Sequence, residues 1–323
     1  MSVASEISPS PVQSAKERRM TIPSPPTLAK LLAAALLVGL ALSTPGFLSR
    51  PSLTALANAM SLVGCVALAM TFVTLGGNIM SFSLGATASV TGIIFMALLG
   101  HGFVVAALAA VFAGIVITAL QGAIIGALRA NPIIVSLAAY ALLIGLTQIV
   151  VGPKMDAPNL DYQFLKGRIG GIPISFLVFA GAAVLAQLVV TFTRFGHELL
   201  LVGSNARAAE AAGIHVTRVT VLAYALAGAL TAIGGILIAS RFGSADMQTA
   251  RGFEYTAIAA VLIGGTAIGG GRGSMIQTFI GMAAIAVINA LALLQGFSME
   301  FQRLTIGLAV LAVVILQGLG RRN

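Results

Sequence analysis

The chain contains ten apolar runs long enough to cross a membrane, and most of its charged residues lie in the short segments between them. An α-helix rises about 1.5 Å per residue, so about 20 apolar residues span the roughly 30 Å hydrocarbon layer of a bilayer. We therefore predict an all-α integral membrane protein with about ten transmembrane helices, at residues 29–47, 53–75, 83–100, 103–128, 132–151, 173–193, 217–240, 254–269, 274–295 and 302–318.

Composition supports a membrane protein and excludes several kinds of site. With 58% hydrophobic and 8% charged residues and a mean hydropathy of +1.03, the chain cannot cover a soluble globule with polar surface. Cys65 is the only cysteine, which rules out an internal disulfide or a cysteine metal cage. The three histidines, His101, His197 and His215, lie between the runs without metal-ligand spacing, so we expect no metal.

Charge distribution predicts how the chain is oriented. Residues 1–28 are rich in Ser and Pro and are predicted to form a disordered tail before a transmembrane domain at 29–318 and a short tail at 319–323. The first apolar run resembles a signal peptide, but the long tail and the later runs favour an uncleaved helix. A cytoplasmic amino terminus puts eleven of the 18 Lys and Arg inside and seven outside. Both termini and the loop at 194–216 are then cytoplasmic, and the net charge of +9 reflects membrane orientation rather than nucleic-acid binding.

The segment 194–218 is the longest polar stretch with helix start and stop signals. Asn205 is a good N-cap, and Gly213 stands where a left-handed C-cap is expected, which predicts a two-turn helix over about 205–213. Arg207 and Glu210 share one face of it. The remaining positions, Ala208 and Ala209 among them, are mostly alanine, so the helix is thin enough to enter a groove of another protein. The alternative is an ordinary loop helix.

Polar side chains within the runs are neutral. No Asp, Glu, Lys or Arg lies near the centre of a run, which argues against a proton pump or antiporter. Hydroxyls and amides exchange hydrogen bonds with a neutral polyhydroxylated solute without the desolvation cost of a charge. The alternative role for each is to join helices. We predict that the solute pathway is lined by Asn78, Ser81, Ser83, Thr87 and Asn289.

Glycines suggest a repeated pattern. Gly76-Gly77 is followed by Gly85, and Gly264-Gly265 by Gly273, each nine residues after the first glycine of its pair. They are consistent with two internal repeats, with interrupted helices near a permeation route, or with chance. The glycine-rich segment 269–274 lacks the Lys-Ser/Thr ending of a phosphate loop, and no Gly-x-Ser-x-Gly elbow is present. We therefore expect no catalytic site in this chain.

Three motifs resemble the membrane permease subunits of ribose-type, or monosaccharide, ABC importers. Residues 203–216 read Gly-Ser-Asn-Ala-Arg-Ala-Ala-Glu-Ala-Ala-Gly-Ile-His-Val, similar to the family's cytoplasmic loop. Residues 254–274 are similar to a second signature and residues 131–137 to a third. After Gly76-Gly77 the family usually has Ile-Asp-Leu-Ser-Val-Gly, whereas this chain has Asn-Ile-Met-Ser-Phe-Ser-Leu-Gly. The missing acidic residue leaves the substrate class open.

The resemblance implies a set of partners. The helix at 205–213 would dock on a separate ATPase subunit that binds ATP and Mg, leaving no cofactor in this chain, and a second permease copy or paralogue would complete the pathway in a bacterial inner membrane. A periplasmic solute-binding protein would dock on the opposite face, with Lys154, Lys166, Arg168, Arg241 and Arg251 as candidate contacts. Two alternatives remain open: an importer of branched-chain amino acids or another small neutral solute, and a secondary carrier that needs no ATPase.

Overall fold

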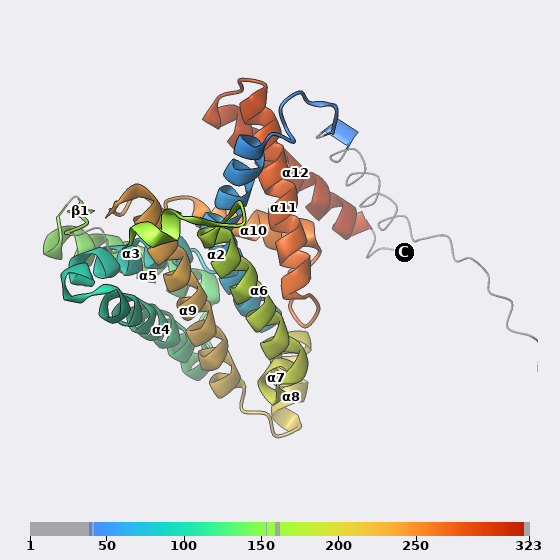
Figure 1. Ribbon diagram of the computed structural model, residues 1–323. Coiled ribbons are helices and arrows are strands. Elements are labelled where there is room, and N and C mark those ends of the chain that lie inside the picture. The colour runs from blue at the N-terminus through green and yellow to red at the C-terminus, as the bar shows by residue number, and fades with distance from the viewer. Residues whose placement is uncertain (1–38, 41, 153, 159–161, 320–323) are drawn as a thin grey trace, which may run out of the picture.

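The computed structural model describes residues 39–40, 42–152, 154–158 and 162–319 (Figure 1). The predicted tail at 1–28 and most of the first predicted span lie outside these residues, as do residues 320–323. The helices are α2 (Arg50–Leu75), α3 (Leu84–Leu98), α4 (Phe103–Leu128), α5 (Pro132–Val150), α6 (Ile174–Phe192), α7 (Arg194–Ser204), α8 (Ala206–Ala211), α9 (Val216–Phe242), α10 (Phe253–Gly264), α11 (Met275–Leu294) and α12 (Met299–Leu319), with 3-10 turns η1 (Leu99–His101) and η2 (Gln163–Lys166).

The predicted fold class is confirmed, because the described part of the chain is built from apolar helices. Seven of them are long and apolar enough to cross a membrane: α2, α3 continued by η1, α4, α5, α6, α9 and α11. Each matches a predicted run to within a few residues. The helix α12 covers the tenth predicted run but is not one of these seven.

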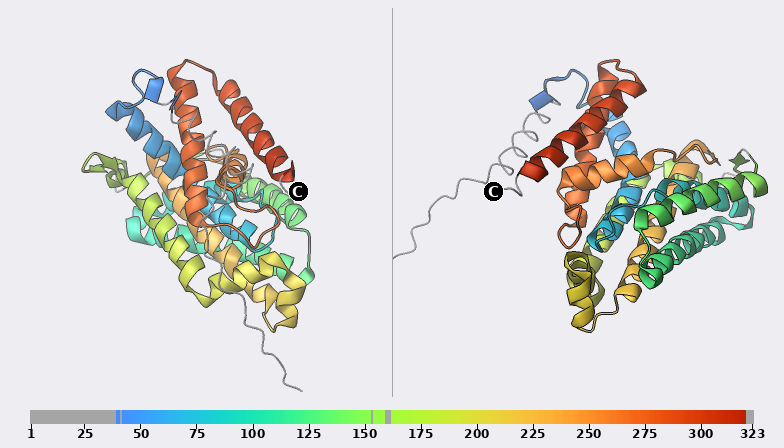
Figure 2. Two further views of the ribbon diagram at one scale, coloured as in Figure 1. Left: turned by 90° about the vertical axis from the view of Figure 1, so that its right-hand side faces the viewer. Right: turned by 180° about the vertical axis from the view of Figure 1, so that it is seen from behind.

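The structure corrects the eighth predicted span, residues 254–269, which is too long. Its helix α10 has 12 residues and ends at Gly264, because Gly265 adopts a left-handed conformation at φ +98°. Twelve residues extend about 18 Å, which is too short to cross the hydrocarbon layer alone. In the right-hand view of Figure 2, α10 runs across the neighbouring helices rather than along them. The apolar residues that follow Gly265 belong to a loop, residues 265–274.

The helix α9 lies at the centre of the packing, against α2, α3 and α4. Small residues allow these close contacts: a Cβ placed on Gly114 of α4 would lie 2.9 Å from the Cβ of Ala232, and one placed on Gly92 of α3 would lie 3.0 Å from the carbonyl oxygen of Gly235. Such contacts are typical of helices that associate in lipid. Lipid tails are as apolar as the side chains, so close packing, rather than burial of apolar surface, drives the association.

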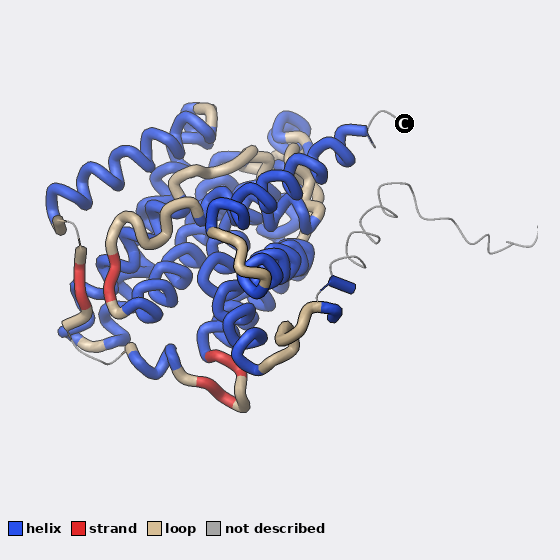
Figure 3. Tube along the Cα trace, turned by 90° about the horizontal axis from the view of Figure 1, so that it is seen from above, coloured by secondary structure: helices blue, strands red, loops and turns tan. Residues whose placement is uncertain are grey.

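The two ends of α9 define two ends of the molecule. Its 27 residues extend about 40 Å. The short helix α8 precedes its first residue, and we call this the α8 end. At the other end, which we call the strand end, β1 (Met155–Asp156) pairs antiparallel with β4 (Ser244–Ala245), and β2 (Arg168–Ile169) pairs with β3 (Ile172–Pro173). Figure 1 shows α8 and β1 at opposite ends, and Figure 3 shows both strand pairs at the rim of the bundle.

Candidate coupling site and polar cavity

The helix α8 forms where the sequence predicts it. The Oδ1 atom of Asn205 accepts a hydrogen bond from the backbone N–H of Ala208 at 3.1 Å, which is N-capping geometry. At the other end Gly213 adopts φ +85°, and the N–H of Ile214 donates to the carbonyl of Ala209 at 3.0 Å. These two caps confirm the predicted helix signals, and the helix itself covers Ala206–Ala211. The polar segment before it is not a loop, because it forms α7.

Most of α8 is exposed. Arg207, Ala208 and Glu210 are exposed, and Ala209 alone of its residues is buried against the rest of the chain. The exposed surface is therefore made of small side chains with two charged ones, a shape that suits insertion into a groove. The predicted role of these residues in docking remains a prediction.

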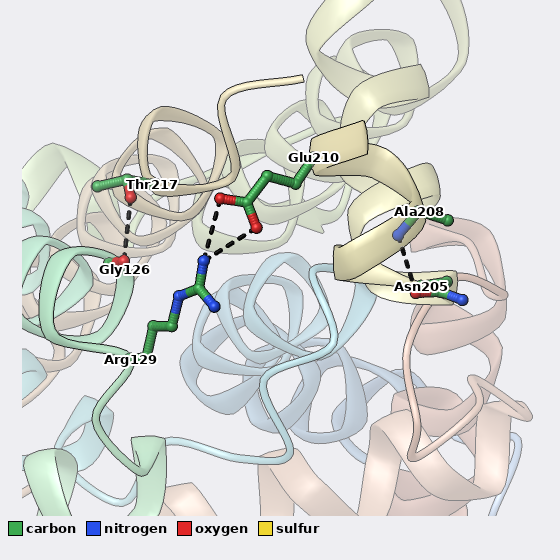
Figure 4. Close-up of polar contacts among 6 residues, drawn as sticks. All are labelled: Gly126, Arg129, Asn205, Ala208, Glu210 and Thr217. Atoms are coloured by element: carbon green, nitrogen blue, oxygen red, sulfur yellow. Dashed lines mark hydrogen bonds and ion pairs between the residues drawn. The ribbon is translucent and has the colours of Figure 1, made fainter. Parts of the chain in front are cut away.

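Glu210 has a partner that sequence reasoning missed. Nη2 of Arg129 donates to both carboxylate oxygens of Glu210, at 2.9 and 3.0 Å (Figure 4). The two side chains are 76% and 55% exposed, so the pair contributes little to stability. Arg129 caps the end of α4 with a left-handed φ of 51°, which is uncommon for a residue other than glycine. The ion pair thus ties α8 to the end of α4.

A cavity of about 870 Å³ at the α8 end is lined in part by this ion pair. It lies between α8, the end of α4, the beginning of α5 and the beginning of α9. Thr217 closes one side by donating to the carbonyl of Gly126 at 3.0 Å (Figure 4). Its charged and polar lining residues are Asn78, Arg129, Arg207, Glu210, His215, Thr217, Arg218 and Thr220. The cavity is therefore polar and carries more positive than negative side chains.

Four of the five predicted pathway residues lie along one short segment, but only one lines the cavity. Asn78 lines it and is 8% exposed. Ser81 and Ser83 are buried, with their hydroxyls 3.1 Å apart, and Ser83 donates to Oε1 of Gln121 in α4 at 2.7 Å. Thr87 bonds to the carbonyl of Ser83 at 2.9 Å, as a threonine in a helix commonly does. In this conformation the serines hold the segment 78–83 to α4.

Asn289 lies apart from the other predicted pathway residues. It belongs to α11, two residues before Leu291, which packs with Phe47 and Leu56 near the beginning of α2. Asn78 follows the end of α2, so most of the length of that helix separates the two asparagines. The Oδ1 atom of Asn289 is buried without a hydrogen-bond partner among the described residues. The structure does not bring Asn289 to the cavity.

Glu254 is a buried charged residue that the sequence did not single out. It lies in the first turn of α10, is 3% exposed, and its Oε2 has no hydrogen-bond partner within the described residues. A Cβ placed on Gly85, in the first turn of α3, would overlap this oxygen. The carboxylate therefore occupies space that Gly85 leaves free. In the sequence, the position of Glu254 at the edge of the eighth apolar run gave no indication that it is buried.

The predicted basic docking residues share the strand end. Lys154 pairs with Asp156 at 2.7 Å, and Arg251 donates to Oε1 of Gln248 at 3.0 Å. All five candidates are exposed: Lys154, Lys166, Arg168, Arg241 and Arg251. The pairing of β1 with β4 draws the segments that carry Lys154 and Arg251 together. The structure thus groups these residues at the end opposite α8.

A bundle of apolar helices, an exposed two-turn helix at one end and a polar cavity beside it define a multi-pass membrane permease. The chain belongs to the family described as branched-chain amino acid transport system / permease component, which matches residues 52–315.

Several curated relatives of the chain are permeases named for sugars. The chain is 32% identical to the ribose import permease protein of Bacillus subtilis (strain 168), over 87% of this chain and 89% of the relative. It is 30% identical to the galactofuranose transporter permease protein of Escherichia coli (strain K12), over 79% and 76%, and 28% identical to the L-arabinose transport system permease protein of the same strain, over 87% of each. No solved structure matches the chain.

Proposed function

We propose that this chain is the permease subunit of a binding-protein-dependent ABC importer and forms the translocation pathway for a monosaccharide or related polyol. Membership of the permease family supports the transport role, and the names of the relatives support a sugar as solute. The observation that carries the proposal is the exposed, capped α8 beside a polar cavity that Asn78 reaches. A neutral amide at that depth suits a solute with hydroxyl groups.

The energy for transport comes from an ATPase subunit that docks at the α8 end. The small side chains of α8 fit a groove, and exposed Arg207 offers a charged contact. The ATPase binds ATP and Mg, and its movement on hydrolysis displaces α8. Glu210 reaches both Arg129 and the outer surface of α8, so it links that displacement to the end of α4.

The strand end faces the periplasm in this proposal, and both termini lie in the cytoplasm. The excess of Lys and Arg on the proposed cytoplasmic side supports this orientation in a bacterial inner membrane. A solute-binding protein with acidic lobes would meet the exposed basic side chains of the strand end, Arg168 and Arg241 among them. A second permease copy, or a paralogue, pairs with this chain in the membrane.

Reconstitution into proteoliposomes tests the proposal. The permease, the candidate ATPase and the binding protein are combined, and vanadate-sensitive ATP hydrolysis is measured together with uptake of labelled ribose. We expect uptake to require both partners. Glu210→Arg is expected to uncouple hydrolysis from uptake. Because this change also breaks the ion pair with Arg129, the double variant Arg129→Glu with Glu210→Arg serves as the control. It restores an internal pair but not the negative charge of α8, so we expect it to stay uncoupled.

Two outcomes separate the proposal from its alternatives. Uptake that proceeds without ATPase and is insensitive to Glu210→Arg would identify a secondary carrier. Because the family description names branched-chain amino acids, unlabelled leucine is added as a competitor. Competition by leucine, and none by pentoses or hexoses, would identify an amino acid importer.

A further inference from the structure

Three distant segments of the chain meet backbone to backbone at glycines. Gly203 near the end of α7, Gly77 after α2, and Gly270 in the loop between α10 and α11 are in mutual contact. A Cβ on Gly270 would lie 2.5 Å from the Cα of Gly77, and one on Gly77 would lie 3.1 Å from the Cα of Gly203. The N–H of Gly271 donates to the carbonyl of Leu75 at 3.0 Å. We call Gly77, Gly203 and Gly270 the glycine junction.

Glycine is required at this junction for two different reasons. Gly77 and Gly270 both adopt φ +80°, a left-handed conformation that other residues rarely take. Gly203 lies in the helix α7, so its requirement is space: a Cβ there would overlap the carbonyl oxygen of Leu75 and lie 2.6 Å from the N of Gly271. No side chain separates the three backbones. A displacement of one segment is therefore passed to the others without the slack that a flexible side chain would provide.

The junction joins the proposed ATPase contact to the segment that carries a cavity residue. Gly203 lies two residues before Asn205, the N-cap of α8. Gly77 is adjacent to Asn78, which lines the cavity, and begins the segment whose Ser83 bonds to α4. Gly270 belongs to the loop that follows α10, the helix that is too short to cross the membrane. The two glycine pairs noted in the sequence thus precede the two loops that meet at this point.

We propose that the glycine junction positions residues 77–83 and 265–274 by transmitting movements of α8 to them, and so couples the ATPase to the pathway. This inference rests on the proposed function. It assigns to Gly77, Gly203 and Gly270 a positioning role for which neither docking nor solute contact is needed. The junction moves as one body, because its three backbones are in direct contact.

The substitution Gly203→Ala tests the junction in the reconstituted transporter with its ATPase and binding protein. The added methyl group pushes α7 away from the ends of α2 and the 265–274 loop. We expect ATPase binding and hydrolysis to persist, and the number of ATP molecules hydrolysed per solute imported to rise about tenfold. Gly145→Ala and Gly181→Ala are matched controls, because a Cβ at either helical position has no neighbour within 4 Å. Both should keep the wild-type ratio.

A cross-link provides a second test if Gly203→Ala does not fold. Ser204 and Gly269 are both exposed, and each is adjacent to a junction glycine, so the pair Ser204→Cys with Gly269→Cys can be joined by a short bifunctional methanethiosulfonate reagent. The only native cysteine, Cys65, is fully buried. If the junction moves as one body, this cross-link leaves coupled uptake at the wild-type level. Loss of uptake that a reductant reverses would overturn the proposal, because the segments would then have to separate during transport.

The outcomes also separate this inference from the proposed function. If wild-type uptake needs no ATPase, the proposed function fails. If wild-type uptake is coupled but Gly203→Ala keeps the wild-type ratio of ATP to solute, the proposed function stands and the junction plays no part in coupling.

Discussion

At the scale of single residues, two charged side chains meet opposite environments. Arg129 extends into solvent and pairs with Glu210 at the surface, where solvent screens the interaction. Glu254 is enclosed between α10 and the first turn of α3, and its Oε2 lacks a hydrogen-bond partner among the described residues. Burial of a carboxylate is costly, so the packing around Glu254 is expected to be sensitive to small changes. A substitution at Gly85, which lies against this carboxylate, measures that sensitivity.

Gly85→Ala should destabilise the protein by about 1 to 3 kcal/mol, because the new methyl group has no space. It would overlap Oε2 of Glu254 and lie 2.9 Å from the carbonyl oxygen of Ala250. Adding Glu254→Ala removes the first of these contacts, so the double variant should lose less stability than the sum of the single variants. Thermal unfolding in detergent measures this, with Gly181→Ala as the control in open space. Strictly additive losses would show that Gly85 and Glu254 are not in contact.

At the scale of elements, local signals predicted the ends of α8 better than those of α10. The caps of α8 depend on Asn205 and Gly213, which affect only the backbone within a few residues of their own positions. The eighth apolar run continues beyond Gly265, so hydrophobicity alone extended the predicted helix through a loop. The structure ends it because Gly265 turns left-handed and Gly264 packs against Gln277 of α11. That contact is a tertiary effect and has no signature in the run itself.

The N-cap of α8 makes a prediction at this scale. Asn205→Ala removes the bond to the N–H of Ala208 and should cost about 1 kcal/mol, whereas Asn205→Asp keeps an acceptor and should cost less. Because α8 is short and mostly exposed, the loss should appear as local opening rather than as a lower melting temperature. Hydrogen exchange of residues 206–214 measures it. Equal protection in wild type and Asn205→Ala would mean that the cap does not hold the helix.

At the scale of the whole molecule, the apolar runs predicted the fold class and the places of nine helices, of which α10 was predicted too long, but not how the helices meet. Arg129 and Glu210 are 81 positions apart, and nothing in either neighbourhood indicates the other. The spacing of the glycine pairs was visible, yet the contact of Gly77 with Gly203 and Gly270 was not. Asn289 was grouped with Asn78 by chemistry alone, and the length of α2 keeps them apart. Long-range contacts of this kind depend on three-dimensional packing.

The central claim is that α8 is the surface on which an ATPase acts, at the end opposite the strand end. The most direct measurement is photo-cross-linking in the assembled transporter, with a photoreactive residue in place of Arg207 and, in a matched variant, in place of Lys166. Both side chains are exposed, one at each end. We predict that position 207 captures the ATPase subunit and that position 166 does not. Capture of the ATPase from position 166, or its absence from position 207, would contradict the account.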